Sequence, residues 1–211
     1  MNACGAMEQP PEGPELPALG SCVPRRGSAW TRWSGRILLR LAGWRIAGRF
    51  PDAPKFVVAV APHTSNWDFI LGVLFRRAVG LGASFLGKDT LFRPPLGWAM
   101  RRLGGTPVYR DAPQGLVGQV AEVFRQREAY VLAIAPEGTR GAVKAWRTGF
   151  YYIALEAGVP IALATIDYGR REIIGGPVLL PSGDFEADFQ TMQDFFQGVT
   201  PKNDAGTIPF L

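Results

Sequence analysis

The chain has 211 residues, 47% of them hydrophobic, which is enough for one folded domain with a buried core. Its net charge of +5 favours an anionic partner, such as a lipid surface, a phosphorylated substrate, a CoA-like carrier or nucleic acid. With one histidine, His63, and two cysteines, Cys4 and Cys22, the composition excludes multi-cysteine zinc centres and metal sites built on several histidines. It also excludes a disulfide framework for the core.

The first residues predict a leader followed by a folded domain. Residues 1–27 are rich in Pro, Gly and Glu, so we expect a disordered leader over this range and the folded domain over residues 28–211. The acidic, proline-rich start is not typical of a signal peptide. Because no stretch of 18 or more apolar residues is free of charge, we expect no membrane-spanning helix.

An amphipathic helix is predicted from residue 28 onward. Its apolar stripe has members at spacings of three and four residues: Trp30, Trp33, Ile37, Leu41 and Trp44. Arginines edge this stripe on one side: Arg32, Arg36 and Arg40. Such a helix suits the surface of an anionic bilayer, and the alternative is an ordinary surface helix packed on the core.

Further along, strands and helices are expected to alternate. Apolar runs predict strands at residues 56–61, 83–86, 104–109, 130–135 and 160–167. Helical patterns cover residues 67–79, 117–126 and 150–157. This order predicts an α/β fold with a mixed, mostly parallel central sheet flanked by helices, preceded by the N-terminal amphipathic helix.

His63 and Asp68 are the first candidates for chemistry. His63 follows the first core strand, and Asp68 lies five positions later. If Ser65 or Asn66 begins a helix, Asp68 lies in its first turn and the two side chains can converge. A carboxylate on one ring nitrogen fixes the tautomer and leaves the other nitrogen free to take a proton. We interpret the pair as machinery for activating an alcohol; the alternative is a capping or core histidine.

A second candidate is the turn at residues 136–140, Pro-Glu-Gly-Thr-Arg. It ends the strand at 130–135, where ligands of α/β sheets usually bind. Arg140 offers a planar fork suited to phosphate oxygens, and Gly138 lets the backbone approach a ligand closely. Alternatively the turn is a solvated loop in which Glu137 pairs with Arg140.

Together the two blocks carry a resemblance. His-x4-Asp followed about seventy residues later by Pro-Glu-Gly-Thr-Arg resembles the acyltransferase family that makes phosphatidic acid from lysophosphatidic acid. The resemblance runs from about residue 56 to residue 167. Residues 104–110 resemble the family's acceptor-binding block, and residues 159–161 resemble its fourth block. Residues 146–150 look like a short prokaryotic branch of the family.

The resemblance implies an O-acyltransferase that uses acyl-CoA or acyl carrier protein as co-substrate, with no metal or other cofactor. His63, oriented by Asp68, would deprotonate the acceptor hydroxyl. The substrate-binding residues that it implies are Lys88, Arg110, Glu137, Gly138, Thr139 and Arg140. It also implies a lysolipid acceptor, an anionic membrane surface as partner, and a peripheral location on the cytoplasmic face of the cell membrane.

Other acceptors and other functions stay open. The sequence departs from the family pattern in four places: Pro62, Tyr109, Ala135 and Leu163. Three of these lie in the blocks that shape the acceptor pocket, so another lysophospholipid or a lyso-aminolipid is an alternative to 1-acyl-glycerol-3-phosphate. A non-catalytic lipid-binding or nucleic-acid-binding protein is the other alternative. The arginines are dispersed and form no recognisable nucleic-acid motif, so we expect no nucleic-acid partner.

Overall fold

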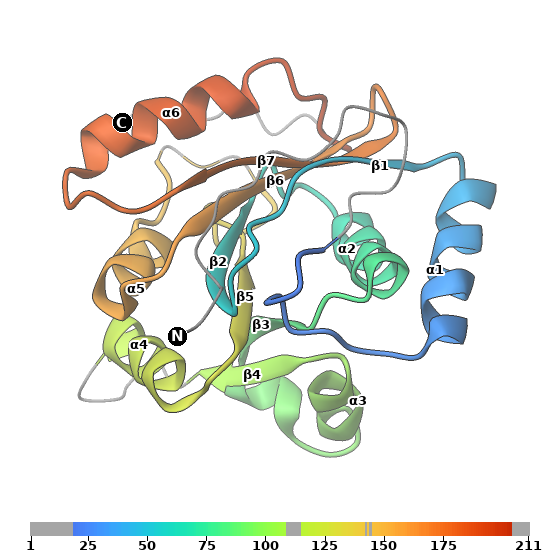
Figure 1. The fold of residues 1–211 in the computed structure, drawn as a ribbon, viewed down its shortest axis with the longest axis horizontal. Helices are drawn as coiled ribbons and strands as arrows, with labels where there is room; N and C mark the ends of the chain where they lie inside the picture. Colours follow the sequence, from blue (N-terminus) through green and yellow to red (C-terminus); the bar gives the residue numbers. More distant parts are fainter. Residues whose placement is uncertain (1–18, 109–114, 142, 144, 204–211) are drawn as a thin grey trace.

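A seven-stranded sheet runs through the centre of the molecule (Figure 1). The computed structural model describes residues 19–108, 115–141, 143 and 145–203. The strands are β1 (Arg45–Gly48), β2 (Lys55–Val60), β3 (Ala83–Lys88), β4 (Gly105–Val108), β5 (Tyr130–Ile134), β6 (Ile161–Asp167) and β7 (Glu172–Leu179). The helices are α1 (Ala29–Leu41), α2 (Asn66–Val79), η1 (Asp89–Phe92), α3 (Gly97–Arg102), α4 (Gly115–Gln126), α5 (Gly149–Ala157) and α6 (Phe185–Phe196).

The strand order is β1-β7-β6-β2-β5-β3-β4. From β6 to β4 all neighbours are parallel, whereas β7 is antiparallel to β6, and β1 is parallel to β7. The predicted α/β fold with a mixed, mostly parallel sheet is therefore confirmed. Because the neighbouring strands from β6 to β4 are parallel, the segments that follow β2, β3, β5 and β6 leave the sheet on the same side.

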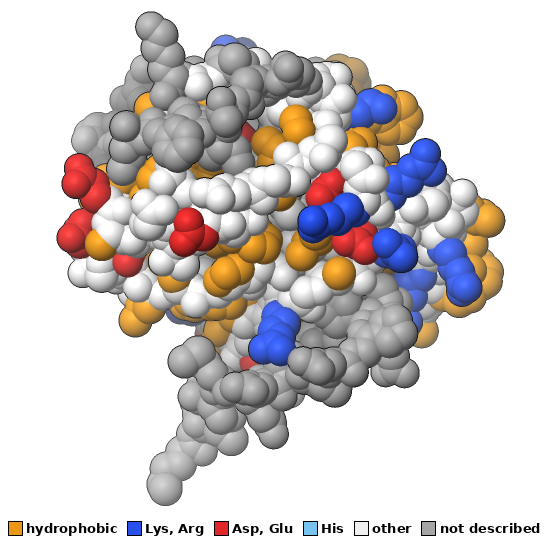
Figure 2. All heavy atoms as spheres, turned by 90° about the horizontal axis from the view of Figure 1, so that it is seen from above, with side chains coloured by type: hydrophobic (Ala, Val, Ile, Leu, Met, Phe, Trp, Pro, Cys, Tyr) orange, Lys and Arg blue, Asp and Glu red, His pale blue; other side chains and the backbone are white. Residues whose placement is uncertain are grey.

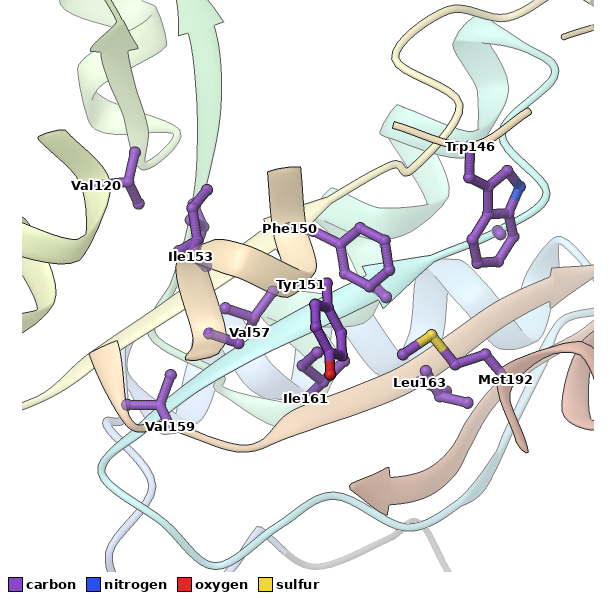
Figure 3. Close-up of a cluster of buried hydrophobic side chains, with 14 of the residues drawn as sticks. Val57, Val120, Trp146, Phe150, Tyr151, Ile153, Val159, Ile161, Leu163 and Met192 are labelled. Carbon is purple, nitrogen blue, oxygen red and sulfur yellow. The ribbon is translucent and has the colours of Figure 1, made fainter. Parts of the chain in front are cut away.

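Both faces of the sheet are buried, because successive strand residues point to opposite sides. On one face, Val57 of β2 packs with side chains of α4, α5 and α6, including Phe150 and Met192 (Figure 3). On the other face, Phe56 and Val58 pack against α1 and α2. These near-continuous apolar strands explain why the central sheet could be read from the sequence.

Helix α1 packs against α2 along a narrow contact. Ser28 caps its start, and Gly35 and Leu39 are the buried residues of the helix. A Cβ at position 35 would lie 2.7 Å from the backbone nitrogen of Ala78, so glycine is what allows the two helices to approach. No helix in the described part of the chain is long and apolar enough to cross a membrane.

The outer face of α1 carries the predicted stripe, with one correction. Its exposed large hydrophobic side chains are Trp30 (69% exposed), Trp33 (52%), Ile37 (36%), Leu38 (50%) and Leu41 (81%). Trp44 was predicted to continue the stripe, but α1 ends at Leu41, and the indole instead meets the ring of Tyr168 edge-on at 5.0 Å. Seen from above, hydrophobic and basic side chains lie side by side at the margin where α1 is found (Figure 2).

The predicted leader is too long at its C-terminal end. Leu19 and Val23 are buried in the core beside α1 and α2, and Arg25 forms an isolated β-bridge with Leu81. Residues 19–27 therefore belong to the folded domain, because their apolar side chains fill the gap between α2 and the sheet. Residues 1–18 lie outside the described residues.

Candidate active site

The loop between β2 and α2 holds the catalytic candidates. Strand β2 ends at Val60, and Ser65 is the N-cap of α2, with Asp68 at the third helical position. Ser65 and Asp68 form a capping box, in which each side chain faces the backbone of the other residue. The expected helix start at Ser65 or Asn66, with Asp68 in its first turn, is thus what the structure contains.

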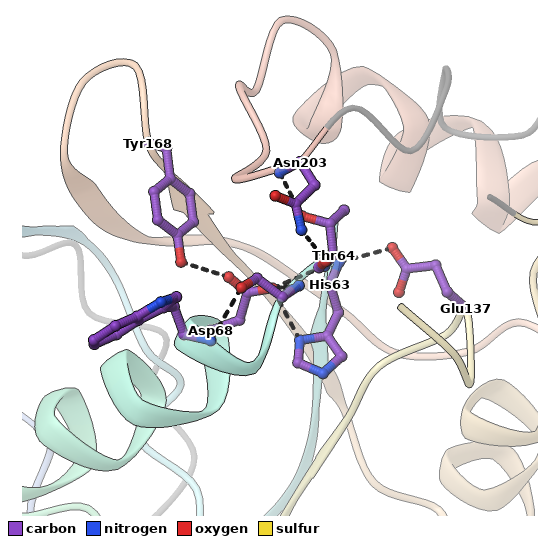
Figure 4. Close-up of polar contacts among 8 residues, drawn as sticks. His63, Thr64, Asp68, Glu137, Tyr168 and Asn203 are labelled. Carbon is purple, nitrogen blue, oxygen red and sulfur yellow. Dashed lines mark hydrogen bonds and ion pairs between the residues drawn. The ribbon is translucent and has the colours of Figure 1, made fainter. Parts of the chain in front are cut away.

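His63 and Asp68 converge as the sequence predicts (Figure 4). The Nδ1 atom of His63 lies 3.2 Å from Oδ2 of Asp68. The carboxylate is 2% exposed and the imidazole 26%, so the aspartate is enclosed while the histidine reaches the surface. With Nδ1 turned to the carboxylate, the other ring nitrogen, Nε2, faces away from Asp68 and is available as a proton acceptor.

Asp68 is held as an anion by several donors. Its Oδ2 accepts hydrogen bonds from the backbone N–H groups of Thr64 and Ser65, both at 2.8 Å, and its Oδ1 accepts one from the hydroxyl of Tyr168 at 2.6 Å. Burial works to raise the pKa of Asp68, but the bonds from His63, Tyr168 and the two backbone groups together lower it below its ordinary value. The carboxylate therefore faces His63 in its charged form.

Glu137 links the second block to the first. Its Oε1 accepts a hydrogen bond of 3.1 Å from the backbone N–H of His63. The side chain is buried, and this burial raises the pKa of its carboxyl group. Its Oε2 is buried without a hydrogen-bond partner among the described residues. The ion pair with Arg140 considered from the sequence is not among the described contacts; Glu137 instead fixes the backbone that carries His63.

The other predicted binding residues are distributed along the same edge of the sheet. Arg140 and Thr139 are exposed in the turn after β5, and Gly138 has a φ of 63°, a left-handed conformation that favours glycine. Lys88 is exposed at the carboxyl end of β3, a strand parallel to β5. Arg110 lies outside the described residues. The structure gives no direct contact between Lys88 or Arg140 and the His63–Asp68 pair.

Two residues of the site were not found from the sequence. Tyr168 follows β6 and reaches Asp68, while Asn203 bonds twice to Thr64, through its backbone N–H to Oγ1 (3.1 Å) and through Nδ2 to the carbonyl oxygen (2.9 Å). Tyr168 had a usable signal, because it directly follows a predicted strand whose carboxyl end reaches the site. Asn203 had no such signal, because it follows α6, a helix that was not predicted from the sequence.

No group of three or more His, Cys, Asp or Glu side chains within the described ranges could hold a metal ion.

Comparisons with known proteins identify the family of the chain. The family model described as Acyltransferase matches residues 49–166, which include both sequence blocks. A chloroplastic 1-acyl-sn-glycerol-3-phosphate acyltransferase of Brassica napus is 27% identical over 128 residues, covering 58% of this chain. The match spans 37% of the length of that relative.

A solved structure shares the fold. The crystal structure of the 1-acyl-sn-glycerophosphate acyltransferase from Thermotoga maritima superposes with a TM-score of 0.54 at 18% identity, covering 81% of this chain and 77% of that chain. At this identity the likeness concerns the fold, and membership rests on the family match, which takes in more than half of the sequence and contains the His63–Asp68 pair. The chain belongs to the acyltransferase family.

Proposed function

We propose that this protein is a glycerolipid O-acyltransferase that moves a fatty acyl group from acyl-CoA or acyl carrier protein to the free hydroxyl of a lysolipid. The preferred acceptor is 1-acyl-glycerol-3-phosphate, and the product is phosphatidic acid. The observation that carries the proposal is the contact between Nδ1 of His63 and a buried, ionised Asp68 at the open edge of the sheet. The names of the Brassica and Thermotoga proteins support the same acceptor.

The chemistry follows from the orientation of the imidazole. Nε2 of His63 takes the proton of the acceptor hydroxyl as the oxygen attacks the thioester carbonyl of the donor. Asp68 stabilises the imidazolium that forms. When the carbon–sulfur bond breaks, the departing thiolate takes the proton back from His63, and the ester and the free thiol leave. The thioester is a co-substrate, so the residues require no cofactor for this step.

Arginine and lysine side chains at the same edge are suited to the acceptor phosphate. Arg140 follows β5 and Lys88 ends β3, so both belong to loops on the side of the sheet where His63 lies. A guanidinium binds two phosphate oxygens in a fork, and an ammonium adds a point charge. We include Arg110, Thr139 and the backbone at Gly138 in this binding surface, as the family resemblance implies.

Helix α1 is the proposed membrane-docking element. Its outer face exposes two tryptophans and three aliphatic side chains, and Arg40 is exposed at its C-terminal end. The helix leads through Trp44 to Tyr168, so its C-terminal end lies at the edge of the sheet that holds His63. Docking of this face on an anionic bilayer would bring a lysolipid in the bilayer close to the catalytic pair. We therefore propose a peripheral location on the cytoplasmic membrane face.

The first experiment is an acyl-transfer assay on lysophosphatidic acid and other lysolipids with one acyl-CoA and one acyl carrier protein. We expect transfer to lysophosphatidic acid, and a drop of at least ~10²- to 10⁴-fold in His63→Ala, because the base is removed. Asp68→Asn should also lower the rate of transfer severely, because the charge that stabilises the imidazolium is lost. Asp188→Asn is its matched control, since Asp188 likewise accepts hydrogen bonds from a tyrosine and a backbone N–H but lies on α6.

The assay separates the alternatives. Preferential transfer to a lyso-aminolipid or another lysophospholipid would support the proposed acyl-transfer reaction but contradict lysophosphatidic acid as the acceptor. No transfer to any acceptor by a folded protein that binds vesicles would indicate a non-catalytic lipid-binding protein. A His63→Ala variant that is folded and as active as the wild type would remove His63 from the mechanism.

A further inference from the structure

Tyr168 reaches the catalytic aspartate from the opposite side to His63 (Figure 4). Its hydroxyl donates a 2.6 Å hydrogen bond to Oδ1 of Asp68, the short length typical of a hydroxyl on a carboxylate. Among the described residues it is the one donor to Oδ1, whereas Oδ2 faces His63 and two backbone N–H groups. The two oxygens of Asp68 thus have separate partners, with histidine on one and tyrosine on the other.

Tyr168 is held in place by contacts from two segments, the residue Trp44 and residues 200–202. Its backbone N–H donates to the carbonyl oxygen of Thr200 at 2.9 Å, and its ring meets Trp44 edge-on. The ammonium of Lys202 lies 5.4 Å from the ring centroid. Strand β6, which ends just before Tyr168, is paired with β2, which ends just before the His63 loop. Because these contacts involve no substrate, the hydroxyl is in position before substrate binds.

We propose that Tyr168 is a positioning residue that, through its hydrogen bond to Oδ1, controls how strongly Asp68 acts on the imidazole of His63. The inference rests on the proposed catalytic role of that pair. By donating a hydrogen bond to Oδ1, Tyr168 stabilises the negative charge of Asp68 and so weakens the interaction of that charge with the imidazole. A carboxylate without this donor would stabilise the imidazolium more strongly, and His63 would hold its proton to a higher pH.

The hydroxyl can serve in this way because it remains protonated. Burial raises the pKa of Tyr168, and the hydrogen bond to Asp68 raises it further, so the group stays a donor across the working range. The other charged or titratable groups that face the cluster among the described residues are Glu137, which accepts from the backbone of His63, and Lys202, over the tyrosine ring. Neither one donates to Oδ1 of Asp68.

The test follows His63 directly, and the single histidine in the sequence makes the imidazole signal unambiguous in an NMR titration. In Tyr168→Phe we expect the midpoint of the His63 titration to move to higher pH, by a shift on the order of half a unit or more. Tyr151→Phe is the matched control, because its hydroxyl donates a 2.7 Å hydrogen bond to Asp188 far along the chain from the site. That control should leave the His63 titration unchanged.

The kinetic arm uses the pH profile of kcat/KM. Tyr168→Phe should lose activity on the acidic side of the profile and recover most of it at alkaline pH. A role that is merely structural would lower activity equally at every pH. Added to Asp68→Asn, the same substitution should cost little, because Tyr168 acts through the ionised carboxylate.

The two arms keep this inference separate from the proposed function. A wild-type protein without transferase activity would contradict the proposed function, while the NMR titration would still report whether Tyr168 acts on His63. An unmoved or lowered titration midpoint in a folded Tyr168→Phe variant would overturn the inference, even in an active enzyme. A pH-independent loss of activity in that variant would overturn it as well.

Discussion

At the scale of single residues, the proposed catalytic residues and the proposed acceptor-binding residues have different surroundings. The imidazole and the carboxylate are held by hydrogen bonds inside the loop after β2, and Glu137 supports that loop from the turn after β5. Arg140 stands three residues further along the same turn and is exposed. Glu137 and Arg140 come from one sequence block, but the first faces the catalytic loop and the second faces solvent, where a phosphate can reach it.

The corresponding prediction concerns Arg140→Ala. With a phosphorylated lysolipid we expect KM to rise by about tenfold to a hundredfold and kcat to change little, because ground-state binding of the phosphate is lost. The KM for a phosphate-free lysolipid should rise much less. Arg140→Lys should not fully restore phosphate binding, because an ammonium group cannot form the two-pronged contact of a guanidinium. Steady-state kinetics on paired acceptors measure this, with circular dichroism as the folding check.

Arg125→Ala is a suitable control for the change in net charge, since Arg125 is exposed on α4 and pairs with Glu122. Equal losses on both acceptors in the Arg140 variant would contradict the phosphate assignment and favour a lyso-aminolipid acceptor.

At the scale of elements, α1 combines a narrow packed face with a broad apolar exposed face. Gly35 and Leu39 are buried towards α2, while the tryptophans and leucines of the outer face are not covered by any described element. Two of the three predicted arginines are partly engaged: Arg32 donates to the carbonyl of Gly27, and Arg36 to that of Ala78. The apolar side chains should therefore contribute more to docking than those two charges.

We expect the double variant Trp33→Ser, Ile37→Ser to bind anionic vesicles at least ~10-fold more weakly, because each buried apolar side chain contributes about 1.5–3 kcal/mol. Salt should weaken binding of the wild type only in part. Leu180→Ser is the control, since Leu180 is as exposed as the tryptophans but follows β7. Co-sedimentation that is unchanged in the double variant and reduced in the control would place docking on another surface.

The strands that could be predicted from the sequence differ from those that could not in how continuous their apolar runs are. The parallel strands β2 to β6 carry apolar runs and were predicted, and so were α2, α4 and α5, whereas η1, α3 and α6 were not. Strand β7 contains Gly175, Gly176 and Pro177, which disguise it because glycine and proline are depleted in strand interiors. Strand β1 has only four residues directly after α1. Because β1 lies at an edge of the sheet, it needs less apolar burial, and its short sequence carries a weaker signal.

The residues of the candidate site also fall into those that could be predicted from the sequence and those that could not. His63 and Asp68 are neighbours along the chain, and local structure brings them together, so they could be predicted. The contacts of Tyr168 with Asp68 and of Asn203 with Thr64 join segments 100 and 139 residues apart. A sequence taken by itself carries no local signal for such pairs, because the tertiary packing of β6 and of the segment after α6 decides them.

At the scale of the whole molecule, the segment after α6 closes over the catalytic loop. Residues 200–203 hold Tyr168 through Thr200 and bind Thr64 through Asn203. Thr64 in turn gives its backbone N–H to Asp68. The C-terminal end of the described chain thus supports the loop that carries His63, although Asn203 and Thr64 are 139 residues apart in sequence.

We expect Asn203→Ala to lower the free energy of unfolding by roughly 1 kcal/mol, since the partly buried hydrogen bond from Nδ2 to the carbonyl oxygen of Thr64 is lost while the backbone N–H bond is kept. The value of kcat should also fall, by a few fold, because the backbone that donates to Asp68 is less constrained. Denaturant unfolding and steady-state kinetics measure the two effects. Gln190→Ala, which removes an exposed side-chain bond on α6, should change neither. A normal kcat in the Asn203 variant would limit the segment to a role in stability.

The pairing of β1 with β7 has a consequence for biosynthesis. The ribosome releases β1 and the loop of His63 before their partners. Strand β1 pairs with residues 172–175, and Asp68 and Thr64 form their long-range hydrogen bonds with Tyr168 and Asn203. Contacts between such distant segments form slowly, because a long loop must close before they contribute. While translation continues, the apolar strand β2 has neither of its sheet neighbours until β5 emerges. The nascent chain therefore exposes an aggregation-prone strand during synthesis, and the loop of His63 and Asp68 gains all its described contacts only after residue 203 has emerged.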